Sequence, residues 1–207
     1  MRTIKNADER KNEILDVAES LFISKGYDNT TINDMLNVMG IARGTLYYHY
    51  KSKEEVLDGI IVRRSTTGAI AAEAIADNNT LSALEKMFKI MLAQKPANEQ
   101  QQQLVTALEN VGNAQMFQKS LNEIILRLAP ILGKVIEQGN KEGVFNTPYA
   151  QDSAEILLAT AHTIFDNVQF RRPPEEMQRK IVAFLFTTER ILGATEGSLL
   201  QLTQLLQ

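Results

Sequence analysis

Residues 30–53 read TTINDMLNVMGIARGTLYYHYKSK, and the rest of the chain is organised around this segment. Thr31 stands three residues before Asp34, the spacing of a capping residue at the start of a helix, and apolar residues follow at helical intervals. Gly40 can take the positive φ that ends a helix, and a second short helix is expected from about Ala42. A helix, a turn that contains glycine and a second helix together predict a helix-turn-helix.

The second of these short helices carries an unusual set of exposed groups. Tyr47, Tyr48 and His49 offer hydrogen-bonding groups on flat apolar bodies. Arg43 offers a planar fork that suits phosphate or guanine, and Gly44 leaves room for another backbone to approach closely. This combination is typical of a surface that meets a nucleic acid.

The charges around the segment agree with this interpretation. No Asp or Glu occurs from Met35 to Lys53, whereas Arg43, Lys51 and Lys53 are basic. A phosphate backbone requires such local electrostatics. An alternative stays open, in which the tyrosines pack under a neighbouring helix and the charges only face solvent.

At these positions the sequence resembles the TetR family of bacterial transcriptional regulators. The run RGTLYYHYKSKE at residues 43–54 satisfies nearly every position of the family's reading head, and the match extends from Thr31 to Leu57 with no insertion. The resemblance implies a homodimer that binds a double-stranded DNA operator of pseudo-palindromic sequence. By the family pattern, the residues at phosphates would be Thr31, Tyr47, Tyr48, His49 and Lys53, and those nearest the base edges would be Arg43, Gly44 and Thr45.

Two residues depart from the family pattern. Ala42 stands where a serine often caps the reading helix, and losing such a cap typically costs about 1 kcal/mol. Tyr50 stands where phenylalanine is usual, and it places a hydroxyl at the edge of the small core. Neither departure removes the expected DNA contacts, although Ala42 has no side chain to reach a phosphate.

Composition bounds the class of protein. The 207 residues are 44% hydrophobic and 23% charged, which is ordinary for a soluble globular chain. The chain has no cysteine, which excludes disulfides and thiolate metal sites and fits a cytoplasmic location, and no apolar stretch is long enough to span a membrane. The net charge of −3 decides little, because residues 1–64 contain equal numbers of basic and acidic side chains.

Helical patterning continues on both sides of the segment, and no strand pattern occurs. Ser52 and Glu55 predict a capped helix that runs to about Asp77, while Thr80 and Thr147 are the expected caps of two later helices. The other predicted helices span residues 8–25, 98–111, 115–138, with a kink at Pro130, and 175–193. We therefore predict an all-α chain with a helix-turn-helix domain at 1–52 and a helical-bundle domain for ligand binding and dimerisation at 53–207.

The resemblance implies that the bundle holds a small, largely apolar effector. The candidate lining residues are Met87, Phe88, Met91, Phe117, Leu121, Ile124, Leu128, His162, Phe165 and Asp166. Methionine and phenylalanine at helical spacing are more often plain core, so that alternative stays open. His162 and Asp166 lie four residues apart and would be polar groups in an apolar bundle.

Two apolar helices around Pro173-Pro174 leave a face unburied in a single copy, and pairing with a second copy would give a two-fold four-helix interface. The candidate interface residues are Leu157, Ala161, Ile164, Val168, Phe184, Leu185, Ile191 and Leu192. The leucine-rich end, residues 197–207, could instead cover this face or add to the dimer.

The sequence does not favour an enzyme. Walker, G-x-G-x-x-G, H-E-x-x-H and G-x-S-x-G motifs are missing, and His49 and His162 lie in different predicted parts, so we expect no catalytic residue, metal or cofactor. An all-helical carrier of small molecules, or an interaction bundle, is the better rival but does not explain the basic and aromatic segment. We predict a DNA-binding repressor that a small molecule releases.

Overall fold

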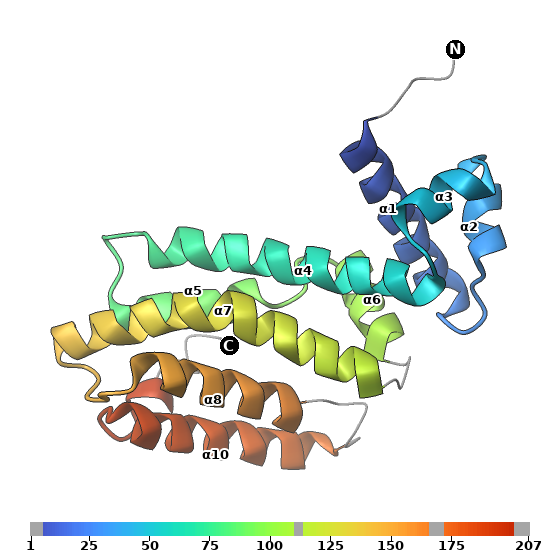
Figure 1. Cartoon of the computed structure of the whole chain (residues 1–207). Helices are drawn as coiled ribbons and strands as arrows, with labels where there is room; N and C mark the ends of the chain where they lie inside the picture. The colour runs from blue at the N-terminus through green and yellow to red at the C-terminus, as the bar shows by residue number, and fades with distance from the viewer. Residues whose placement is uncertain (1–5, 110–113, 166–171, 201–207) are drawn as a thin grey trace. The chain divides into compact units, whose positions relative to one another are not determined.

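The computed structural model describes residues 6–109, 114–165 and 172–200, and these residues form helices and no strand (Figure 1). The predicted all-α class is therefore confirmed. The helices are α1 (Ala7–Lys25), α2 (Ile32–Met39), α3 (Arg43–His49), α4 (Lys53–Ala76), α5 (Ala83–Ala93), α6 (Glu99–Glu109), α7 (Ala114–Glu142), α8 (Ala150–Ile164) and α10 (Pro174–Leu192).

The chain forms two compact units. The first contains residues 1–64 and 96–119, and the second contains residues 65–95 and 120–207. Helices α4 and α7 contribute residues to both units. The predicted boundary between residues 52 and 53 separates functional domains. The two units are defined by packing alone, so this boundary stays a prediction.

Side-chain caps set where several helices begin. The Thr31 hydroxyl accepts from the Asp34 amide at 3.1 Å, and the Asp34 carboxylate accepts from the Thr31 amide at 2.8 Å. These reciprocal bonds satisfy amide groups that the first turn of α2 leaves unpaired. The Ser52 hydroxyl accepts from the Glu55 amide at 3.1 Å at the start of α4. Both predicted caps are confirmed, although the Glu55 carboxylate accepts from the Lys51 amide, so the second bond of the capping box expected at Ser52 is replaced.

Two helices begin later than the sequence pattern indicated. Ser82, not Thr80, caps α5, because Glu85 returns a hydrogen bond to the Ser82 amide at 2.8 Å. The Thr80 hydroxyl instead donates to Asn78 Oδ1 at 2.7 Å. The predicted cap Thr147 precedes α8 by two residues and accepts from the Tyr149 amide at 3.3 Å. Its hydroxyl thus closes a turn rather than a helix.

The core of the first unit fixes the short helices. Met35 of α2 and Leu46 of α3 are completely buried against Ile14 and Phe22 of α1 in one apolar cluster. Leu104 of α6 is also part of this cluster, at 4% exposed. Helix α6 therefore stabilises the packing of α2 and α3, although 49 residues lie between α3 and α6 in sequence.

A buried lysine anchors the end of α4 in the second unit. Lys86 of α5 is 2% exposed, and its ammonium donates to the Ala76 carbonyl at 2.6 Å and to Gln138 Oε1 at 2.7 Å. Ala76 is the last residue of α4, where carbonyl groups lack helical partners and the helix dipole favours a cation. A buried charge is stable only with such partners, so these bonds hold the ends of α4 and α5 to α7.

Candidate nucleic-acid interface

Local chemistry sets the turn between α2 and α3. Gly40 ends α2 with φ of 61°, and its amide donates to the Leu36 carbonyl at 2.9 Å. This left-handed conformation is open to glycine at little cost. Helix α3 follows from Arg43, and Ala42 makes no side-chain cap, as its residue type requires. The helix-turn-helix predicted from the sequence is thus present.

Helix α3 buries one side and exposes the other. Leu46 is buried, whereas Arg43, Gly44 and Tyr48 are exposed, with 75% of Tyr48 accessible. Thr45, Tyr47 and His49 are half-buried, and the Tyr48 and His49 rings meet edge to face at 5.0 Å between centroids. A tyrosine this exposed contributes little to the core, so the alternative in which the tyrosines pack beneath a neighbouring helix fails for Tyr48.

Gly44 has no packing reason to be glycine within the chain. A Cβ built at this position would meet no atom within 4 Å. Gly59, by contrast, would place a Cβ 2.9 Å from the Tyr50 ring. The fold therefore requires glycine at Gly59, whereas any requirement at Gly44 comes from outside the chain.

Charged side chains flank α2 and α3. Asp34 accepts a hydrogen bond from Lys25 at 2.8 Å, and this bond, with those from Thr31, lowers the pKa of its carboxyl to about 2. Lys51 donates to the Tyr47 carbonyl at 2.6 Å at the end of α3. Arg43 donates from Nη2 to Oδ1 of Asn33 at 2.8 Å. Arg43 thus pairs with a neutral amide and keeps its full charge.

Lys53, a predicted phosphate contact, has a second role in the structure. Its ammonium donates to the Tyr27 carbonyl at 2.8 Å and lies 4.1 Å from the centroid of the Tyr27 ring. Burial, with the nearby Glu54 carboxylate, raises the pKa of Tyr27 to about 12. Lys53 therefore joins the first turn of α4 to the turn that precedes α2.

The predicted effector residues do not all fall in one unit. Phe117 belongs to the first unit, whereas the other described candidates belong to the second. Leu128 lies in the apolar core of the second unit, Met91 is largely exposed, and Asp166 lies outside the described residues. The remaining candidates are half-buried: Met87, Phe88, Leu121, Ile124, His162 and Phe165. The Phe165 ring packs edge to face on Phe184 at 5.4 Å.

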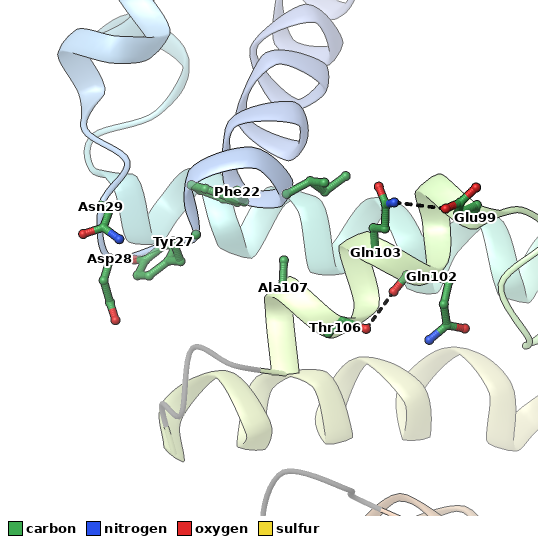
Figure 2. A pocket seen from close by; sticks show the side chains of 11 residues that line it. Phe22, Tyr27, Asp28, Asn29, Glu99, Gln102, Gln103, Thr106 and Ala107 are labelled. Atoms are coloured by element: carbon green, nitrogen blue, oxygen red, sulfur yellow. Dashed lines mark hydrogen bonds between the residues drawn. The ribbon is translucent and has the colours of Figure 1, made fainter.

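A groove of about 670 Å³ lies in the first unit, between the end of α1 and one face of α6 (Figure 2). None of the predicted effector residues lines it. The lining residues are Phe22, Ile23, Gly26, Tyr27, Asp28, Asn29, Glu99, Gln102, Gln103, Thr106 and Ala107. The lining therefore mixes apolar side chains with the carboxylates, amides and hydroxyls of the others. The glutamine run at 100–103 is the feature of the sequence that marks the α6 side of this groove. The sequence alone does not show that the run lies beside α1.

The candidate dimer residues divide by burial. Leu157 and Leu192 are buried in the core of their own unit, so their side chains are not available to a second copy. Ala161, Ile164, Phe184, Leu185 and Ile191 are half-buried, and Val168 lies outside the described residues. Helices α8 and α10 lie side by side (Figure 1) and expose other apolar residues: Ile156, Ile181, Val182 and Phe186. A helix that is apolar on several sides does not reveal from its periodicity which side faces the core.

Metal-binding clusters and membrane-spanning helices are both absent from the described residues. These residues contain no group of three or more His, Cys, Asp or Glu side chains that could hold a metal ion. None of the helices within them is long and apolar enough to cross a membrane.

Two family models match the chain. Residues 14–60 match bacterial regulatory proteins of the tetR family, and residues 95–187 match the tetracyclin repressor-like C-terminal domain. Together these matches cover well over half of the chain.

Curated relatives carry related names. The uncharacterized HTH-type transcriptional regulator YfiR of Bacillus subtilis is 29% identical over 149 residues, which are 69% of this chain and 73% of that protein. The HTH-type transcriptional repressor BepR of Brucella suis is 26% identical over 166 residues, 76% of this chain and 79% of that one. The biofilm operon regulator IcaR of Staphylococcus epidermidis is 48% identical, but over only 46 residues, 22% of this chain and 25% of that one.

Solved structures share the fold. SmeT, the repressor of a multidrug efflux pump of Stenotrophomonas maltophilia, has a TM-score of 0.64 at 18% identity and covers 90% of this chain and 91% of its own. A TetR-family regulator from Mesorhizobium loti has a TM-score of 0.63 at 17% identity, with 90% and 98% covered. The helix-turn-helix, the helical C-terminal part and the two family models agree: the chain belongs to the TetR family, whose members are DNA-binding transcriptional regulators and not enzymes.

Proposed function

We propose that the chain is a transcriptional repressor that binds a pseudo-palindromic DNA operator as a homodimer. The observation that carries this proposal is the exposed face of α3, where Arg43, Gly44 and Tyr48 lie uncovered on a helix held by the buried Leu46. Relatives named as repressors, among them BepR, support repression as the outcome. Two heads would enter successive major grooves about 34–36 Å apart.

The residues of the head divide into two roles. Tyr47, Tyr48 and His49 would contact phosphates, together with Thr31, which is exposed at the start of α2. Arg43, Gly44 and Thr45, in the first turn of α3, would lie nearest the base edges. Because phosphate contacts fix position and base contacts select sequence, the two groups predict different variants.

Lys53 would act in two ways. In the free chain its ammonium is bonded to the Tyr27 carbonyl, so a phosphate must be reached without losing this link or in exchange for it. An ammonium has three donors, and the bonds from Lys53 to the carbonyls of Tyr27 and Asp28 leave one for a phosphate. We therefore keep Lys53 among the DNA contacts and add a structural role.

Dimerisation would use the outer faces of α8 and α10. Ile156, Ile181, Val182 and Phe186 are each at least 41% exposed, and together they form an apolar surface on neighbouring helices. A monomer in water rarely leaves such a patch uncovered. The half-buried candidates Ala161, Phe184 and Leu185 would lie at its margin, whereas Leu157 and Leu192 only support it from below.

Release would follow the binding of a small, largely apolar molecule in the second unit. Helix α4 contributes its first half to the first unit and its second half to the second, so it is the element through which such binding can reach the head. To lower the DNA-competent fraction of dimers from about 99% to 1%, the effector must bind the incompetent conformation more tightly than the competent one by roughly 5.5 kcal/mol. We propose residues 1–52 as the DNA-binding domain, residues 53–207 as the ligand-binding and dimerisation domain, and the cytoplasm as the place of action.

The test is selection from a pool of random duplexes by the purified full chain, followed by a salt titration on the selected sequence. We expect a pseudo-palindrome, bound with an affinity that falls steeply with salt because phosphate contacts release counterions. A folded, dimeric chain that selects no sequence would overturn the proposal and favour the carrier of small molecules.

A further inference from the structure

The side chain of Arg43 is held by a residue of the other helix of the helix-turn-helix. Its Nη2 donates to Oδ1 of Asn33 at 2.8 Å. Asn33 is the second residue of α2, and Arg43 is the first residue of α3. Both side chains are exposed, so this bond is made on the surface and not within the core.

The choice of partner preserves the positive charge of Arg43. Asp34 is the neighbour of Asn33, but its carboxylate already accepts from Lys25 at 2.8 Å and from the Thr31 hydroxyl at 2.8 Å. Arg43 is therefore paired with an amide, which carries no charge, although an acid stands next to it in sequence. A pairing with a carboxylate would have cancelled the charge that DNA requires.

The pairing also leaves most of the guanidinium available. Arginine has five N–H donors in a fixed planar fork, and the bond to Asn33 uses one of them. A bidentate contact to O6 and N7 of guanine requires two. Without the bond to Asn33, the Arg43 side chain would lose rotamer entropy when DNA binds. A side chain that is already held in one orientation loses less.

We propose that Asn33 is a positioning residue that fixes the Arg43 guanidinium for a guanine in the major groove. The inference rests on the proposed function and extends it, because it names the base and a residue on α2 that controls its recognition. Asn33 needs no contact with that base. It acts by restricting where the fork of Arg43 can point.

The experiment compares variants on three duplexes: the selected operator, the same operator with the guanine replaced by adenine, and a random duplex. The variants are Asn33→Ala, Arg43→Ala and the double variant, with Asn37→Ala as the matched control, since Asn37 is exposed one turn further along α2. Dissociation constants are measured at one salt concentration. Thermal melting verifies that each variant is folded.

We expect Asn33→Ala to reduce the preference for guanine over adenine by about tenfold through its coupling to Arg43, with unchanged binding to the random duplex. In the Arg43→Ala background the same substitution should change nothing, and Asn37→Ala should behave as the wild type. If Asn33 had only a structural role, Asn33→Ala would instead weaken binding to all three duplexes alike, both in the wild type and in the Arg43→Ala background.

A second variant tests the charge argument. Asn33→Asp keeps an acceptor at the same position but adds a negative charge beside the guanidinium. We expect weaker binding to all three duplexes and a log–log salt slope that is less steep by about one unit. An unchanged slope would contradict the role assigned to the neutral amide.

Different outcomes overturn the proposed function and the positioning role of Asn33. A wild-type chain that selects no sequence overturns the proposed function, and this inference with it. A wild-type chain that selects an operator, combined with an Asn33→Ala variant that retains full discrimination, overturns the inference alone. The inference alone is also overturned if Arg43 is essential for binding but the base pair that it selects in the operator does not contain a guanine at that position.

Discussion

The α2–α3 pair and the α8–α10 pair expose opposite kinds of surface. On α3 the uncovered groups are a guanidinium, a phenol and a glycine, at Arg43, Tyr48 and Gly44. On α8 and α10 they are the aliphatic and aromatic side chains of Ile156 and Phe186, with exposures of 54% and 49%. Both pairs rest on buried apolar residues, so the difference lies entirely in what each leaves outside.

This difference indicates which kind of partner each pair of helices binds. A surface of hydrogen-bonding groups on short, well-anchored helices suits a charged, hydrated partner such as DNA. An apolar surface on longer helices suits a second copy of the same surface. If the comparison is right, a substitution in one pair should leave the property of the other unchanged, apart from effects that pass through dimerisation.

The largest effect is expected from breaking the apolar pair. In the double variant Val182→Asp/Phe186→Asp, the dimer would bury two carboxylates on each copy, which costs more than the interface can supply. We expect a monomer by analytical ultracentrifugation. Operator affinity should fall by more than about 100-fold, because the two heads no longer bind as one unit.

Thr187 provides a control in which one carboxylate is added elsewhere on the exposed surface of α10. It is exposed on α10, lies about 100° around the helix from Phe186, and its hydroxyl donates to the Ala183 carbonyl at 2.9 Å. Thr187→Asp should remain dimeric. A dimeric Val182→Asp/Phe186→Asp variant would show that copies associate elsewhere.

A smaller effect, confined to DNA, is expected from Tyr48→Ala. The side chain is 75% exposed, so the melting temperature should hardly change. Affinity for the operator and for a random duplex should fall together by about tenfold, the cost of one hydrogen bond to a charged group. Fluorescence anisotropy on both duplexes measures this.

Tyr149 sharpens the same test from the other region. It is an exposed tyrosine beside α8, with 67% of its side chain accessible. Tyr149→Ala should leave both affinities at the wild-type value. Equal losses for the two tyrosines would mean that exposure alone, and not position on α3, caused the effect.

Local chemistry explains how far the sequence could predict the fold. Thr31 with Asp34, Ser52 with Glu55 and the left-handed Gly40 each act within four residues, and the sequence placed all three correctly. The start of α5 was misplaced because two hydroxyls compete there. The glutamate three residues after Ser82 decides the competition, and no such acid follows Thr80.

Contacts between distant residues explain what the sequence could not predict. Leu104 of α6 packs in the same core as Met35 and Leu46, although α4 and α5 lie between them in sequence. No periodic pattern in the sequence predicts that packing. The identity of the exposed α3 residues was readable from the chain. The bond between Arg43 and Asn33 was not, because an exposed arginine has many rotamers and the sequence does not select one.

Gly44→Ala separates folding from recognition within α3. No atom lies within 4 Å of the added Cβ, and alanine favours a helix over glycine by up to about 1 kcal/mol. We expect a head that is slightly more stable to urea and yet binds the operator more weakly, because the methyl group would stand where the DNA approaches. Gly59→Ala is the contrasting variant, and it should destabilise the head because its Cβ meets the Tyr50 ring at 2.9 Å.

The smallest effect is expected in the core beneath α3, where Tyr50→Phe should stabilise the chain. The Tyr50 hydroxyl is buried and has no hydrogen-bond partner among the described residues, and the side chain is 3% exposed. An unpartnered buried hydroxyl costs about 1 kcal/mol or more, so its removal should raise the free energy of unfolding by about that amount. DNA affinity should not change, since the hydroxyl faces Gly59 and not the exposed side of α3.

The pH dependence of this gain distinguishes the buried hydroxyl from better packing in general. Burial raises the pKa of Tyr50 from 10.0 to about 12. Above pH 10 the phenol therefore ionises in the unfolded chain but stays neutral in the folded one, which removes stability from the wild type as the pH rises toward 12. Phenylalanine does not titrate, so the advantage of Tyr50→Phe should grow over this interval, while Tyr27 titrates alike in both proteins. A constant advantage from pH 7 to 11.5 would contradict this origin and leave packing as the cause, because only a group whose pKa differs between the two states makes the difference depend on pH.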